Sequence, residues 1–532
     1  MSMDVIVTSR GTTFARERVM LALSLALGAL ALIGTLAYHN VADSDLWARL
    51  VAGAHVWKYH TVAARDFLAY TPVLDAWVDH EWGAGFVFCT AIRWFGPTAL
   101  MILKMVLALT ALGLAMTVAY RRCRSMHAVI TVAVPCAVVL LHGYVPVIRS
   151  HAFTYTLFAL ILLCFERIRE GARWPLAVLP PIFIFWTNVH GGFVSGLGVF
   201  GIYAAWAVWR RRYPLRWILV GLVSLIGTLV NPYGFRFWTY LMPALLHERA
   251  TITEWQPLAL FGWDTFIGFR LLFALVVLVM MFSWRRKRGE HDVVQLAILG
   301  VTAYLGWSHR RHGPFFAVAV AAFAPDYLLA FCHTLGSRLS AARRQAAAGW
   351  ITLILCAVCA LWVAANYLPD ASLQVLAPVG SYPVREVDIL RRAGVKGNLV
   401  VPFRWGSYAA WRLHPDVLVS IDGRYEETFP ERTFDENHNF FRKQGDDWTR
   451  LVEAHHTDFV ILENTYTRVT SADLADLGFY PVWQEAGSAL YAAKPWIEAL
   501  TAAARSLPDH TVDPLSRDFV RGWCRTMGAP PD

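Results

Sequence analysis

Residues 19–38 read VMLALSLALGALALIGTLAY and contain no charged side chain. An α-helix rises about 1.5 Å per residue, so this stretch is long enough to cross the roughly 30 Å hydrocarbon core of a membrane. Further apolar blocks follow up to about Leu368. The chain is 56% hydrophobic and only 16% charged, against about 25% charge in a typical soluble domain. We therefore predict a polytopic α-helical membrane protein.

Clusters of basic residues between the apolar blocks predict the orientation of the chain, because Lys and Arg are enriched in cytoplasmic loops. Such clusters precede the first block and recur at residues 121–124, 167–173, 210–216, 285–288 and 338–344. If all of them are cytoplasmic, successive clusters enclose an even number of spans and the C-terminus lies outside. About eleven spans meet this condition, at residues 19–38, 98–120, 127–144, 152–166, 174–189, 192–209, 215–231, 267–283, 293–307, 314–333 and 347–367.

The block from Trp82 to Pro97 is predicted to be interfacial or re-entrant. Arg93 interrupts it, and counting it as a span would reverse the side of every later basic cluster. The transmembrane part then covers residues 1–368, with a long first outer loop at residues 39–97. Residues 369–532 form an extracytoplasmic domain with a C-terminal tail.

The composition of this C-terminal domain turns polar, and short apolar runs alternate with helical stretches. NLVVPF, VLVSI, TRLVEAHHT and DFVILE follow one another in this way. Such a βαβ rhythm predicts a small α/β domain of about 130 residues. Asp422, Gly423 and Arg424 follow the second run, where they form either a functional loop or a tight turn. Cys524 is the domain's single cysteine, so the domain contains no internal disulfide.

Unusual polar residues remain on the outer side once the basic clusters are placed inside. Polar side chains at span ends cost little near the membrane surface, which is one interpretation of them. Asn188 and His190 stand between two apolar stretches in WTNVHGGFVSG, however, where neither acts as a charge signal. A functional cluster is the second interpretation, and its candidates are Asp43, Asp45, Asp79, His80, Glu81, Arg149, Asn188, His190, Arg310 and Arg311.

Several short strings, taken in order, resemble bacterial members of the GT-C superfamily of integral-membrane glycosyltransferases. They are ADSDLW, RDFLAYT, AWVDHEW, NVHGGF, NPYG and an Arg-rich turn before a Pro-containing helix. Relatives include protein O-mannosyltransferases, aminoarabinose transferases and oligosaccharyltransferase catalytic subunits. The resemblance covers residues 1 to about 370. The double-Trp-Asp signature of the oligosaccharyltransferase group is absent, so recognition of a peptide acceptor is not implied.

The resemblance implies a catalytic carboxylate in the first outer loop, just after the first span. Asp45 is the best match, and Asp43 behind it suits a helix-capping role. Glu81 is a second carboxylate, which would orient the acceptor or help Asp45 hold a divalent metal such as Mg or Mn. Metal dependence differs among the groups of this superfamily and stays open here.

The leaving group of such a reaction is a phosphate, whose growing charge placed cations would stabilise. Arg149, Arg310 and Arg311 are suited to this role because Arg makes planar, two-pronged contacts with phosphate. The alternative is that they extend to lipid headgroups. Asp79, His80, Asn188 and His190 are further candidates for substrate contacts.

The sequence therefore predicts transfer of a sugar from a polyprenyl-phosphate-linked donor to a glycan, lipid or protein acceptor. The reaction would occur at the outer face of the bacterial cytoplasmic membrane. Nucleic acid is not an expected partner, because the basic residues form short clusters instead of one stripe. Two other classes remain open, a transporter or flippase of a lipid-linked or polar solute and a non-catalytic scaffold for envelope assembly.

Overall fold

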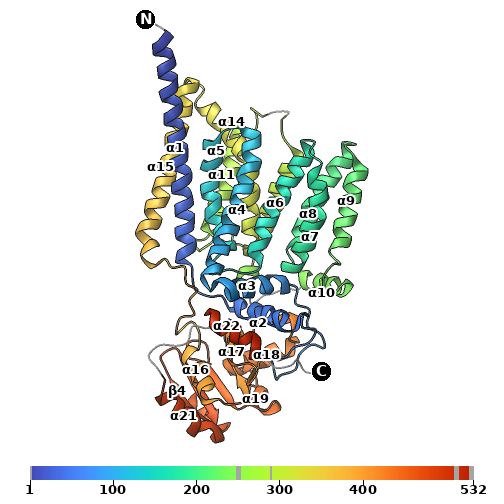
Figure 1. Ribbon diagram of the computed structural model, residues 1–532, viewed down its shortest axis with the longest axis vertical. Coiled ribbons are helices and arrows are strands. Elements are labelled where there is room, and N and C mark those ends of the chain that lie inside the picture. The colour runs from blue at the N-terminus through green and yellow to red at the C-terminus, as the bar shows by residue number, and fades with distance from the viewer. Residues whose placement is uncertain (1–2, 247–252, 288–289, 508–514, 527–532) are drawn as a thin grey trace.

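The computed structural model describes residues 3–246, 253–287, 290–507 and 515–526, and it consists of a helical bundle with a small domain at one end (Figure 1). Arg288 of the predicted basic cluster lies outside the described residues. The bundle helices are α1 (Met3–Tyr38), α4 (Thr98–Cys123), α5 (Met126–Leu140), α6 (His151–Arg169), α7 (Trp174–Val189), α8 (Phe193–Trp209), α9 (Pro214–Gly227), α11 (Ile267–Ser283), α12 (Val293–Ser308), α13 (Gly313–Phe323), α14 (Pro325–Leu335) and α15 (Ala341–Asn366).

Each predicted span coincides with a helix or, in one case, with the pair α13 and α14. This pair is bent by 55°, and Pro325 begins its second member. Proline lacks the N–H that would continue the helical hydrogen bonds. By length and composition, five helices of the described residues can cross a membrane, and the bent pair is a sixth candidate. The shorter apolar helices α7, α8, α9, α11 and α12 lie below this length, so the count of eleven stays a prediction.

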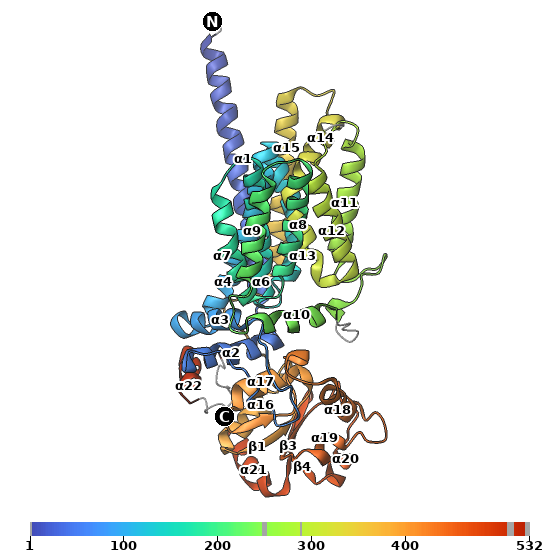
Figure 2. The same ribbon diagram turned by 90° about the vertical axis from the view of Figure 1, so that its right-hand side faces the viewer.

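Three helices lie across the end of the bundle nearest the small domain instead of along it: α2 (Ser44–Tyr59), α3 (Trp82–Phe95) and α10 (Phe235–Leu246) (Figures 1 and 2). The segment predicted to be interfacial or re-entrant is α3. It packs closely on α2 because both helices present glycine at the contact. A Cβ atom at Gly53 would lie 2.1 Å from the carbonyl oxygen of Gly85, and one at Gly85 would lie 2.3 Å from that of Arg49.

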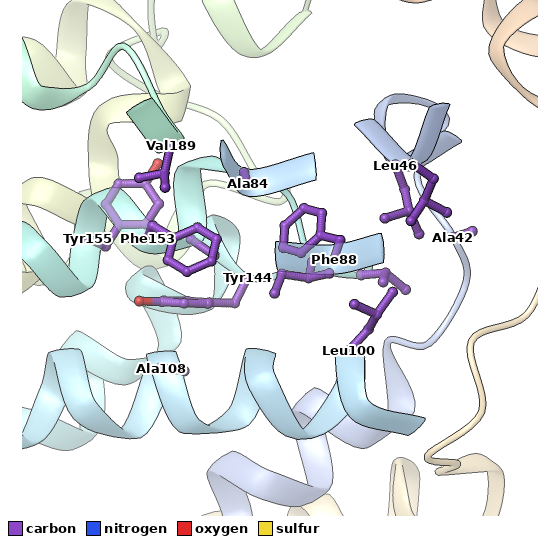
Figure 3. Packing of buried hydrophobic residues seen from close by; sticks show 14 of the residues in the cluster. Ala42, Leu46, Ala84, Phe88, Leu100, Ala108, Tyr144, Phe153, Tyr155 and Val189 are labelled. Carbon is purple, nitrogen blue, oxygen red and sulfur yellow. The ribbon is translucent and has the colours of Figure 1, made fainter. Parts of the chain in front are cut away.

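An apolar core joins this layer to its neighbours. On the bundle side, the ring of Phe88 in α3 stacks 6.0 Å from that of Phe153 in α6, within the cluster drawn in Figure 3. On the other side, Trp47 of α2 is fully buried against the rings of Tyr382 and Tyr408 from the C-terminal part. Full burial of a large apolar side chain stabilises a fold by roughly 1.5–3 kcal/mol, so α2 holds the two parts together.

The C-terminal domain contains a five-stranded sheet in the order β2-β1-β3-β5-β4. Its strands are β1 (Gly397–Val400), β2 (Val417–Val419), β3 (Phe459–Glu463), β4 (Phe479–Gln484) and β5 (Ser488–Ala493). β1 pairs in parallel with β2 and β3, as the βαβ rhythm predicts, whereas β3, β5 and β4 are antiparallel. The helices of this part are α16 (Val384–Ala393), α17 (Phe403–Leu413), α18 (Glu431–Arg442), α19 (Arg450–Ala454), α20 (Ser471–Asp476), α21 (Ile497–Arg505) and α22 (Arg517–Thr526).

The first outer loop extends this sheet, which the sequence pattern did not predict. Val419 of β2 donates its N–H to the carbonyl of Leu68 at 2.9 Å and accepts from the N–H of Tyr70 at 3.2 Å. Thr71 adds a side-chain bond of 2.6 Å to the carbonyl of Ser420. Residues 68–71 therefore run beside the edge strand β2, and the first loop and the C-terminal domain fold as one layer below the bundle.

Candidate active site

The start of α2 fixes two neighbouring carboxylates. Asp43 is the N-cap, and its side chain accepts a hydrogen bond of 3.0 Å from the N–H of Asp45. Asp43 also accepts a 2.6 Å bond from Nη2 of Arg149. These contacts use the free N–H groups of the first helical turn and bury the carboxylate. The capping role that suits Asp43 in the sequence is the one the structure shows.

Asp45, in the first turn of α2, differs from Asp43 because 46% of its side-chain surface is open. Its nearest cation is Arg149, whose Nε lies 3.8 Å from Asp45 Oδ2. Burial of this region and the adjacent Asp43 raise the pKa of Asp45 to about 7, although Arg149 acts in the opposite direction. An open carboxyl group that titrates near neutral pH can both accept and release a proton there.

Arg49, one helical turn after Asp45, is buried among three carboxylates. It forms ion pairs with Asp79, with Glu81 at 3.4 Å and with Glu427 at 3.2 Å. His80 Nδ1 lies 3.2 Å from Glu427. Burial alone would lower the pKa of His80, but the Glu427 carboxylate outweighs it and raises the pKa to about 9. The cluster thus joins α2, the first loop and the C-terminal domain through alternating charges.

Glu81 is part of this cluster instead of standing open beside Asp45. Burial acts to raise the pKa of its carboxyl group, but Arg49 and His80 outweigh burial and hold the pKa well below its usual value. Glu81 is therefore ionised at neutral pH and poorly suited to take up a proton. Its contacts direct it toward Arg49, and the two roles predicted from the sequence, orienting the acceptor or holding a metal with Asp45, stay predictions.

The contacts of His190 identify which of its ring nitrogens carries the proton. Nδ1 accepts the backbone N–H of Gly192 at 2.8 Å, so this nitrogen is unprotonated in the neutral ring. Thr154 also contacts Nδ1 at 2.8 Å, and its hydroxyl accepts from Trp186, which leaves its own proton to donate. Burial lowers the pKa of His190 to about 3. Neutral His190 therefore presents Nε2–H toward Glu81, 3.5 Å away.

A second charged group lies beside Asp45 and comes from later connections between the bundle helices. Arg149 pairs with Glu254 at 3.0 Å, and Arg311 lies 3.7 Å from the same carboxylate. The guanidinium of Arg311 is centred 4.5 Å from the Trp255 ring. Arg310 points elsewhere, because its Nε donates to the carbonyl of Pro257 and its guanidinium lies over Phe266. Of the two adjacent arginines, only Arg311 contacts the site in the described part of the chain.

Two other predicted residues lie behind the site. Asn188 accepts from the Trp82 indole at 2.9 Å and donates to the carbonyls of Ile184 and Val230, so it ties α3 to the ends of α7 and α9. Asp79 is buried beneath Arg49, and its N–H donates to the hydroxyl of Tyr233 in the NPYG turn. Both residues hold the scaffold of the site.

The Asp422-Gly423-Arg424 turn connects the C-terminal domain to the first loop. Arg424 is fully buried and pairs with Asp422 at 2.6 Å and with Asp66 of the first loop at 2.5 Å. Gly423 stands between Asp422 and Arg424 in the chain, and a Cβ atom at this position would lie 3.5 Å from Asp45 Oδ1. The two charged residues of the turn therefore have a structural role, and Gly423 faces the open carboxylate of Asp45.

Sequence reasoning missed Arg49 and Glu427. A single Arg within the apolar helix LWARLVAGAHVW, four residues after Asp45, was an available signal for Arg49. No local signal marks Glu427, whose partners come from the first loop and α2. Among the described residues, His, Cys, Asp and Glu side chains form no group of three or more arranged to hold a metal ion.

No protein-family model matches the sequence, and no curated protein matches it. Two crystal structures of ArnT from Cupriavidus metallidurans are similar to the chain, each with 14% sequence identity. The apo structure aligns with a TM-score of 0.48 over 92% of this chain and 99% of the other. The structure bound to undecaprenyl phosphate aligns with a TM-score of 0.46 over 89% and 97%.

Proposed function

We propose that this protein is a membrane glycosyltransferase that moves a sugar from a polyprenyl-phosphate-linked donor to an acceptor hydroxyl. The observation that carries the proposal is the geometry around Asp45. An open carboxyl group with a pKa of about 7 lies beside Arg149, while the surrounding carboxylates are occupied by ion pairs. A proton acceptor next to a cation suits a displacement in which a hydroxyl loses a proton and a phosphate leaves.

In this reaction the acceptor oxygen forms a bond to the anomeric carbon as the bond from that carbon to the phosphate oxygen breaks. The hydroxyl proton passes to Asp45, and the electron pair of the broken bond stays on the polyprenyl phosphate. The guanidinium of Arg149, whose Nε lies 3.8 Å from Asp45 Oδ2, places a positive charge beside the leaving phosphate. Arg311 adds a second positive charge on the same side.

The alternatives make different demands on the structure. A transporter that works by alternating access binds its solute near the middle of the bilayer, between two halves of the bundle. Here the cluster around Asp45 gathers at one end of the bundle, where ion pairs tie it to the C-terminal domain. This placement supports an enzyme whose acceptor approaches from the aqueous side. A scaffold would need no titrating carboxyl group, so loss of Asp45 distinguishes it.

We further propose that the protein lies in the bacterial cytoplasmic membrane with this domain outside the cytoplasm. Arg121 and Arg122 end α4 at the end of the bundle away from the domain, as the positive-inside rule requires of a cytoplasmic loop. The acceptor class, whether glycan, lipid or protein, is left open by these residues.

The proposal is tested with purified full-length protein and a panel of polyprenyl-phosphate-linked sugars. The assay measures release of polyprenyl phosphate and labelling of added acceptors. We expect turnover with at least one donor, and Asp45→Asn should lower it by roughly 10²-fold or more because the amide keeps the shape but takes no proton. Asp75→Asn, an exposed change in the same loop, is the control. Equal turnover by wild type and Asp45→Asn would remove the assignment of Asp45.

A further inference from the structure

Two buried cysteines from distant parts of the chain lie close together beside α2. Cys89 lies in α3 and is fully buried, and Cys524 lies in the C-terminal helix α22 and is 7% exposed. Figures 1 and 2 both place α22 against the layer formed by α2 and α3. α22 packs directly on α3, and the two free thiols lie close enough together to shift each other's pKa.

Packing fixes the backbone of both cysteines. Trp523, next to Cys524, donates its indole N–H to the carbonyl of Trp411 at 2.6 Å, and the two rings stack 4.7 Å apart. Cys89 is held by the close approach of α2, since a Cβ atom at Gly53 would lie 2.8 Å from Cys89 Cβ. The proximity of the two thiols therefore follows from how α22 packs on the domain and how α3 packs on α2.

Charge near the pair favours the thiolate form of one sulfur. Arg93 lies one helical turn after Cys89, close enough to Cys524 to act on its thiol. Contact with Cys89 and with Arg93 lowers the pKa of Cys524 to about 7, whereas contact with Cys524 and burial raise the pKa of Cys89. A thiol with a lowered pKa is the one that attacks a disulfide. The charge of Arg93 interrupts the apolar block of α3, and Cys524 gives that charge a specific partner.

We propose that Cys89 and Cys524 form a disulfide bond that links the C-terminal helix to α3. The proposal rests on the proposed orientation, which places this end of the protein in an oxidising compartment. The oxidant is the disulfide of a thiol–disulfide oxidoreductase. Cys524 thiolate attacks one of its sulfurs and releases the other as a thiolate. Cys89, after losing its proton, then attacks Cys524 sulfur and releases the second, so the oxidoreductase leaves as a dithiol with the two electrons.

The bond would hold the C-terminal domain to the platform that carries the site. α2 lies between the two parts, with Asp45 and Arg49 on it, and α22 packs on α2 as well as on α3. A covalent link from α22 to α3 closes a loop that includes most of the chain. It restricts separation of the domain from the bundle and so stabilises the arrangement in which Glu427 reaches Arg49.

Mass spectrometry of the full-length protein, purified in detergent without reductant, tests the bond directly. The protein is denatured, alkylated before any reduction and digested. We expect a linked peptide pair that contains Cys89 and Cys524 and separates on reduction. Cys136 and Cys164, which are buried in α5 and α6, serve as internal controls and should be alkylated without reduction. Alkylation of both Cys89 and Cys524 before reduction overturns the proposal.

Three variants separate a bond from packing alone. Because a disulfide needs both sulfurs, Cys89→Ser, Cys524→Ser and the double variant should lower the thermal midpoint by the same amount. Reductant should lower the wild-type midpoint to that value and leave the variants unchanged. Additive losses without any effect of reductant overturn the proposal. Labelling of an exposed position in whole cells determines the side of the domain independently. An outside domain with two free thiols refutes the bond alone, whereas an inside domain refutes the proposed orientation.

Discussion

Glu427 and Arg49 are separated by 378 residues in the chain, and their side chains form an ion pair of 3.2 Å. This contact carries the charge network of the bundle end into the C-terminal domain. The same glutamate pairs with His80, so one side chain of the domain holds two cationic side chains of the charged cluster. The domain is therefore a part of the site as well as its cover.

Removing the charge of Glu427 should lower both stability and turnover without abolishing either. We expect Glu427→Gln to lower the free energy of unfolding by about 1.5–3 kcal/mol, the usual contribution of a hydrogen bond to a charged group. Arg49 keeps Asp79 and Glu81 as partners, which limits the loss. Turnover should fall through kcat more than through KM, because the change misplaces the groups around Asp45. Glu431→Gln, an exposed change in α18, is the matched control. Unchanged stability and kcat would show that the pair contributes little.

The raised pKa of His80 predicts how stability depends on pH. Its folded value is about 9, and an unperturbed histidine titrates near 6.5. Protonated His80 therefore stabilises the fold fully below about pH 6.5, and this contribution is lost as the pH rises through about 9. Wild type should lose stability between pH 7 and about pH 9.5, and His80→Gln should show a smaller loss over that interval. The exposed His456→Gln is the control. Parallel curves for wild type and His80→Gln would contradict the assignment.

The pKa of Asp45 predicts the pH dependence of transfer. A base must be unprotonated, so kcat/KM should rise about tenfold per pH unit below the pKa of about 7 and level off above it. Asp45→Asn should remove this limb. The raised pKa of Asp45 also affects the stability of the fold. A carboxyl group whose pKa is raised in the folded state destabilises the fold once it ionises. Asp45→Asn should thus be more stable than wild type at pH 8 and similar at pH 4. A limb that persists in Asp45→Asn would assign it to another group.

Local patterns predicted the helices of the bundle and the first three strands, because hydropathy and alternation are properties of neighbouring residues. The DSDLW string suited Asp43 to a helix cap, and Asp43 is the N-cap of α2. The features that the sequence pattern did not predict depend on contacts between residues far apart in the chain. The edge pairing of residues 68–71 with β2 is of this kind, and so are the partners of Arg49. The β4–β5 hairpin was also missed, since its strands did not continue the βαβ rhythm.

The orientation of the protein is testable by labelling in cells. In a cysteine-free background, Lys396→Cys places a thiol on the domain at a side chain that is 79% exposed. Ala342→Cys places one at the exposed start of α15, in the basic cluster at the opposite end of the bundle. An impermeant thiol reagent should label the first position in intact spheroplasts, and it should label the second only after the membrane is opened. The reverse pattern would place the domain and the site in the cytoplasm.

The two adjacent arginines before α13 provide a matched pair for the leaving-group role. Arg311 lies 3.7 Å from Glu254, which also binds Arg149, whereas Arg310 contacts Pro257 and Phe266 on the other side of the turn. Arg311→Gln should therefore weaken donor binding and lower turnover by about tenfold or more, since one donor to a developing anion contributes up to 10²- to 10³-fold. Arg310→Gln should leave both nearly unchanged. Arg311→Lys should recover part of the loss, because it keeps the charge but not the planar fork that contacts two phosphate oxygens.

Donor binding and single-turnover transfer are measured for all three variants. If Arg310→Gln is the more damaging change, the cation that meets the phosphate comes from the opposite face of the turn, and the Arg149–Glu254–Arg311 group only holds the outer loops together.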